Sequence, residues 1–121
     1  MATTRRPRAE LPLIQKTYDL VLWMGQKVGK FPRDQKFLLG DRVQNGLLDF
    51  LGLLVEAEYS PRKLAVLERA SVLFEKLRLM LRLCNDLRLL GQDGYRHASM
   101  QVAEIGRMLG GWLKQQKGLP A

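Results

Sequence analysis

The chain has 121 residues, 46% of them hydrophobic and 26% charged, a composition typical of one globular domain that needs no metal or disulfide. A single cysteine excludes an intrachain disulfide, and no apolar run approaches the ~20 residues that span a bilayer. Twenty Lys and Arg against twelve Asp and Glu give a net charge of +8, which favours polyanionic partners, nucleic acid first. We therefore expect a cytoplasmic protein without a membrane partner.

The chain begins with a basic segment that we expect to be a disordered arm, residues 1–12. Its charge alone makes three arginines candidate RNA contacts: Arg5, Arg6 and Arg8. The spacing then predicts a first helix over residues 13–28, because apolar or small residues recur at steps of four and three. These residues form its expected core face: Ile14, Tyr18, Val21, Gly25 and Val28.

Three more helices follow, separated by short segments rich in glycine and proline. The second, residues 34–58, has an expected inner face of Leu39, Val43, Leu47, Phe50, Leu54 and Ala57. The third spans residues 61–90, with Ser60 as its N-cap and Pro61 in its first turn, and "GQDG" closes it at Gly91. The fourth spans residues 95–117 and leaves a short tail, residues 118–121.

No stretch alternates like a strand, so the fold class is all-α. Four helices with short connections predict an antiparallel up-down-up-down four-helix bundle over residues 13–117.

The fourth helix contains Gly106, Gly110 and Gly111, which together cost it about 2–3 kcal/mol relative to alanine. Its bulky seam is Ala98, Val102, Ile105, Leu109 and Trp112. Next to this seam on the helix surface lies a strip of small residues, each one position after a seam residue in the sequence: Ser99, Ala103, Gly106 and Gly110. A phosphate loop needs glycines at a strand-to-helix turn, so we interpret the strip as a packing surface, either within the subunit or between subunits.

The third helix is apolar on more than one side. Leu67, Phe74, Leu77 and Leu81 form one face, whereas Val72, Leu79, Leu83 and Leu90 lie ~160–180° away at ~100° per residue. Burial of both sides requires another copy or a large partner surface, so we expect a homo-oligomer.

Two arginines interrupt the apolar surface of this helix, Arg78 and Arg82, four residues apart on one stripe. They are either surface side chains, with Glu75 paired to Arg78, or a ridge that meets phosphates or an acidic partner. The pattern alone leaves both interpretations open.

Residues that carry catalysis are missing. The sequence has no nucleotide-binding glycine loop and no Ser–His–Asp set. The single cysteine, Cys84, lies in a leucine-rich helix, where we expect it to be a buried hydrophobe, and His97 has no second histidine for a zinc site. We therefore expect a binding or assembly protein, not an enzyme, with no metal and no cofactor.

Three stretches, "KFPRDQKFLLGDRV", "LERASVLFEKLRLMLRLCNDL" and "AEIGRMLGGWLK", resemble the accessory variability determinant (Avd) family of diversity-generating retroelements, part of a wider group of bacterial four-helix-bundle proteins. The resemblance implies a basic homopentameric barrel that binds a reverse transcriptase and nucleic acid, including template RNA and possibly DNA. It also implies that the protein supports mutagenic cDNA synthesis.

The family's LRxxLR arginines, tied to reverse-transcriptase association, match Arg78 and Arg82. Its GRxLG stretch matches Gly106, for which the resemblance implies packing, and Arg107, for which it implies a weaker binding role. The alternative is a stand-alone adaptor of the 23S rRNA intervening-sequence type, from the same wider group but without a reverse-transcriptase partner.

Overall fold

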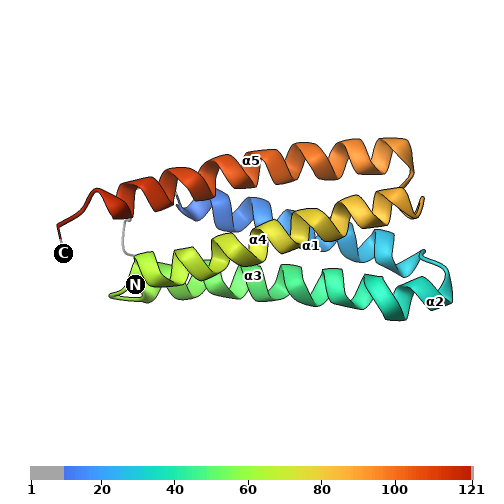
Figure 1. Cartoon of the computed structure of the whole chain (residues 1–121), viewed down its shortest axis with the longest axis horizontal. Helices are drawn as coiled ribbons and strands as arrows, with labels where there is room; N and C mark the ends of the chain where they lie inside the picture. The colour runs from blue at the N-terminus through green and yellow to red at the C-terminus, as the bar shows by residue number, and fades with distance from the viewer. Residues whose placement is uncertain (1–9, 121) are drawn as a thin grey trace, which may run out of the picture.

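The structure is a computed structural model that describes residues 10–120. Its helices are α1 (Glu10–Gly29), α2 (Arg33–Gln35), the π-helical segment η1 (Lys36–Gly40), α3 (Asp41–Tyr59), α4 (Lys63–Asp86) and α5 (Gly91–Lys117). The four long helices lie side by side and alternate in direction (Figure 1), which confirms the four-helix bundle for this part of the chain. Of the predicted arm, residues 1–9 lie outside the described residues. Residues 10–12 are not part of an arm but belong to α1.

The helices form a ring in which each packs mainly against two others. α1 and α4 both contact α3 and α5, so α1 and α4 lie diagonally across the bundle. Figure 1 shows α4 at the front, with α1 behind it. This arrangement leaves α4 with one side turned to the core and the opposite side turned outward.

The core confirms the predicted faces of three helices. The predicted inner residues of α3 and its π segment, of α5, and of the first α4 face are all buried, and so is Cys84. Trp112 is buried with them, and the half-buried Trp23 stacks on His97 with a ring-centroid distance of 4.6 Å.

The predicted core face of α1 is wrong by one position except at Val28, which is buried as predicted. The buried seam is Leu13, Thr17, Leu20, Met24 and Val28, whereas Tyr18 is 51% exposed. Both seams have helical spacing, but the buried one carries the larger aliphatic side chains. The Thr17 hydroxyl donates a hydrogen bond to the Leu13 carbonyl at 2.9 Å, which satisfies its polar group inside the core.

The second predicted helix contains a π turn that its sequence pattern does not reveal. In η1 the Asp41 N–H donates to the carbonyl of Lys36, five residues back. At Gly40 a Cβ atom would lie 2.7 Å from Cγ1 of Val28, so only glycine allows α1 and η1 to approach this closely. The extra residue turns Phe37 and Leu38 outward, at 61% and 69% exposure.

The third helix ends at Asp86, four residues before its predicted end. Arg88 adopts a left-handed backbone with φ of 61°, the Arg88 N–H donates to the Asn85 carbonyl, and the Leu89 N–H donates to the Cys84 carbonyl. These two bonds form a Schellman motif that satisfies the last carbonyls of α4, with arginine where glycine is usual. Leu90 is then buried, so it does not belong to the second apolar side of α4.

Candidate binding groove

A groove between α4 and α5 contains most of the residues that the sequence singles out. It consists of two adjoining depressions of about 280 and 440 Å³, both lined by Glu75 and Arg78. Arg82 and Ser99 line the first and Arg107 lines the second. The small residues form the α5 side: Ser99 and Ala103 in the first depression, and Ala103, Gly106 and Gly110 in the second.

The sequence produces this groove because the small strip lies next to the buried seam of α5. Val102 and Leu109 are buried in the core and also line the groove. The strip residues beside them have no more than two side-chain heavy atoms each. Larger side chains at these positions would fill the groove between α4 and α5. The sequence predicts the strip and the arginines separately, and the structure brings them together in one groove.

The glycines of the strip differ in what they contact. At Gly106 a Cβ atom would lie 3.1 Å from Cε2 and 3.4 Å from Cζ of Phe74, so this glycine allows α5 to pack closely on α4. A Cβ atom at Gly110 or Gly111 would meet no neighbouring heavy atom within 4 Å. Gly106 therefore packs within the subunit, whereas Ser99, Ala103 and Gly110 are exposed along the groove.

Alanine at the two strip glycines is expected to have opposite effects on stability. Gly110→Ala should raise the free energy of unfolding by about 0.5–1 kcal/mol, because alanine favours the helix and its methyl group meets no neighbour. Gly106→Ala should lower it by about 1 kcal/mol, because the buried Phe74 ring has little room to move. Thermal unfolding of both variants measures this difference, and equal shifts would contradict the packing role of Gly106.

The arginines of the groove are exposed and only weakly paired. Arg78 lies 3.5 Å from a Glu75 oxygen, and their side chains are 55% and 65% exposed. Within residues 10–120, Arg82 forms no ion pair with an acidic side chain. Because exposed ion pairs contribute about 0–1 kcal/mol, both guanidinium groups are available to a partner at little energetic cost.

Arg107 belongs to a separate cluster of charges on the α5 side. It lies 3.8 Å from Glu104, which also forms a 2.7 Å ion pair with Lys16 of α1. The hydrogen bond from Lys16 and its positive charge lower the pKa of Glu104, burial opposes this effect, and Arg107 adds a smaller favourable contribution. The cluster joins α1 to α5 and leaves the Arg107 side chain 72% exposed.

Two groove residues have no signal in the sequence that would have found them. Tyr95 lines the first depression and Leu113 lines the second. Both come from α5, and only the packing of α4 against α5 identifies them as groove residues. Arg5, Arg6 and Arg8 lie outside the described residues, so their relation to the groove stays a prediction.

Other reactive groups lie away from this groove. Burial raises the pKa of the Cys84 thiol to about 11, so the reactive thiolate is disfavoured at neutral pH. Among residues 10–120, no three His, Cys, Asp or Glu side chains gather as metal ligands would. No helix in the same part of the chain has the length and apolarity to cross a membrane.

Comparison with known protein families gives a match that covers most of the chain. A scan against protein-family models matches residues 11–116 to the bAvd-like family. A search of curated proteins finds no match. The matched span begins one residue after the start of α1 and ends one residue before the end of α5, so it includes both sides of the groove.

Proposed function

The chain belongs to the bAvd-like family, and on this basis we propose that it is a non-catalytic accessory protein of a diversity-generating retroelement. It binds the reverse transcriptase of that element and its template RNA, and so supports mutagenic cDNA synthesis. The family match over residues 11–116 supports the retroelement role over the stand-alone adaptor of the intervening-sequence type.

The α4–α5 groove is the docking site for the reverse transcriptase. The observation that carries this proposal is the exposure of Arg78 and Arg82 on one wall of the groove, with Arg107 on the other wall. Guanidinium groups bind carboxylates in two parallel hydrogen bonds, and the small residues opposite leave space for a helix or strand of the partner. The enzyme would present acidic side chains here.

RNA binds through the overall positive charge of the protein. A net charge of +8 on 121 residues attracts a phosphodiester chain without reading its bases, and DNA would bind in the same way. Assembly into a homopentamer would multiply this charge fivefold. Binding of this kind weakens steeply with salt, since counterions released from the RNA drive it.

The proposal is tested by cDNA synthesis from template RNA with purified reverse transcriptase, in the presence and absence of this protein. We expect cDNA to form only in its presence. We also expect the affinity for RNA alone to fall at least about tenfold between 50 and 200 mM salt. Equal cDNA yields with and without the protein would contradict the accessory role and favour the stand-alone adaptor.

A further inference from the structure

Two aromatic rings meet at the surface where α1 packs against α5. Trp23 of α1 and His97 of α5 have ring centroids 4.6 Å apart and ring planes inclined by 37°. We call these two residues the ring pair. Trp23 is half-buried and packs against the core, whereas His97 is exposed. Packing within the subunit therefore explains the position of Trp23, but it leaves part of the imidazole open to solvent.

Contacts on both sides of the ring pair hold it in place. On one side, Lys16 of α1 forms a 2.7 Å ion pair with Glu104 of α5. On the other side, Lys27 of α1 reaches the first turn of α5, where its Nζ would lie 3.8 Å from a Cβ atom at Gly94. Both contacts follow from the antiparallel packing of α1 and α5 (Figure 1). The rings are thus fixed before a ligand arrives, which lowers the entropy lost on binding.

Positive charge gathers on the side of the ring pair toward the α1–α2 turn. The Nζ of Lys27 lies 5.3 Å from the centroid of the Trp23 ring, a cation–π contact that keeps the ammonium group beside the rings. Residues 23–30 and 91–97 contain three cationic side chains and one acidic side chain: Lys27, Lys30, Arg96 and Asp93. This side therefore attracts an anion.

The opposite side of the ring pair has no such excess. Asp19 lies one turn before Trp23 on α1, and Glu104 pairs with both Lys16 and Arg107. Two acidic side chains there offset two cationic ones. A polyanion that reaches the ring pair is therefore drawn toward the α1–α2 turn rather than toward the middle of the bundle.

We propose that the ring pair is a stacking site for one unpaired base of an RNA strand, with the neighbouring phosphates at Lys27 and Arg96. This inference rests on the proposed function, which assigns RNA binding to the overall charge, and it gives that binding a location. A base has a flat π face to place on the open imidazole, and stacking of this kind accepts any base. Phosphates beside the base match the ammonium and guanidinium groups. An acidic peptide would meet the cations but leave the open imidazole uncovered.

The test compares two labelled single strands of equal length by fluorescence anisotropy. One is an oligouridine, and the other is an abasic strand that carries the same phosphates but no bases. His97→Ala should weaken binding of oligouridine at least about fivefold, the lower limit of what stacking of one base contributes. It should leave the affinity for the abasic strand unchanged. His97→Tyr keeps an aromatic ring at this position and should bind both strands as the unaltered protein does.

Tyr59→Ala is the matched control, since it removes an aromatic ring that is 75% exposed. Tyr59 ends α3, at the opposite end of the bundle from the ring pair (Figure 1). This variant should bind both strands as the unaltered protein does. Circular dichroism verifies that all three variants are folded.

Two results for His97→Ala would overturn the proposal: equal losses for the two strands, or no loss for oligouridine. A loss of oligouridine binding in Tyr59→Ala as large as in His97→Ala would overturn it too, because exposed rings in general would then bind bases. If His97→Ala loses affinity for oligouridine alone but cDNA synthesis does not need the protein, the stacking site stands and the accessory function fails. If cDNA synthesis needs the protein and His97→Ala binds both strands normally, the accessory function stands and the stacking site fails.

Discussion

Replacement of both Arg78 and Arg82 by alanine is expected to weaken binding to the reverse transcriptase by at least about 100-fold. Each guanidinium group that bonds a carboxylate contributes about 1.5–3 kcal/mol, so the loss of two amounts to about 3–6 kcal/mol. Both side chains are exposed and bury no core surface, so the melting temperature should change little. Titration of the purified enzyme against both proteins measures the affinity.

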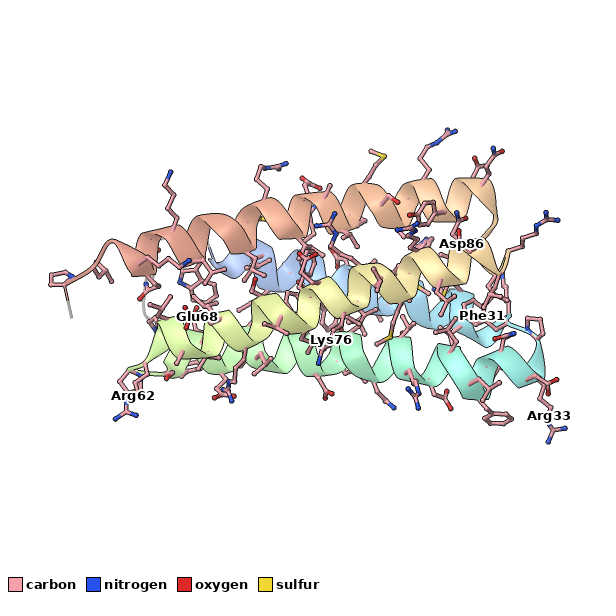
Figure 2. The ribbon with its side chains drawn as sticks, in the orientation of Figure 1. Phe31, Arg33, Arg62, Glu68, Lys76 and Asp86 are labelled. Carbon is pink, nitrogen blue, oxygen red and sulfur yellow. The ribbon has the colours of Figure 1, made fainter. Side chains whose placement is uncertain are left out.

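The control for this experiment is Arg33→Ala with Arg62→Ala. These arginines are exposed and lie at opposite ends of the bundle (Figure 2), away from the groove. The control removes the same two positive charges, so any loss through overall electrostatics affects both variants equally. Equal affinities for the groove variant and the control would contradict a docking role for Arg78 and Arg82.

Phe74→Ala is expected to lower the free energy of unfolding by about 3–5 kcal/mol, the largest stability effect of any change considered. Phe74 is 5% exposed, its ring centroid lies 5.3 Å from that of Phe50 on α3, and its edge lies against Gly106 of α5. Truncation leaves a cavity where three helices meet. Urea unfolding at fixed protein concentration should show a midpoint lower by roughly 2 M with an unchanged slope.

Phe37→Ala is the matched control, because it deletes the same atoms from a side chain that is 61% exposed. It should change the free energy of unfolding by less than about 1 kcal/mol. A loss for Phe74→Ala no larger than for Phe37→Ala would show that α3, α4 and α5 do not meet at this ring.

The buried face of a helix could be predicted from the sequence where one lengthwise row of apolar residues has larger side chains than the rows beside it. In α5 the seam from Ala98 to Trp112 stands beside a strip of small residues, so only one burial pattern is possible. In α1 two neighbouring seams have similar spacing, and the choice between them depends on the space that α3 and α5 leave. Periodicity alone selected Tyr18, which the structure places at the surface.

Helix ends and the π turn were harder to predict because they depend on backbone details. The end of α4 rests on Arg88 in a left-handed conformation, which a sequence rule assigns to glycine. The π turn of η1 depends on the close approach of Gly40 to Val28, two residues from different elements.

The groove was predictable in its parts but not as a whole. Arg78 and Arg82 followed from their spacing and from the family resemblance, and the strip residues followed from their size. Their meeting in one groove depends on how α4 packs against α5, which leaves a gap beside Arg78 and Ala103. Similarly, the apolar surplus of α4 was visible in the sequence, whereas the exposure of Tyr18 on α1 was not, because periodicity placed this residue in the core.

The most direct test of the account is capture of the reverse transcriptase by this protein after nuclease treatment. Removal of RNA eliminates the indirect contact through which two RNA-binding proteins could be recovered together. We predict that the enzyme is retained in 0.15 M salt and that the Arg78→Ala, Arg82→Ala variant loses it. Recovery of the enzyme only when RNA is intact would contradict a direct contact and, with it, the proposed role of the α4–α5 groove.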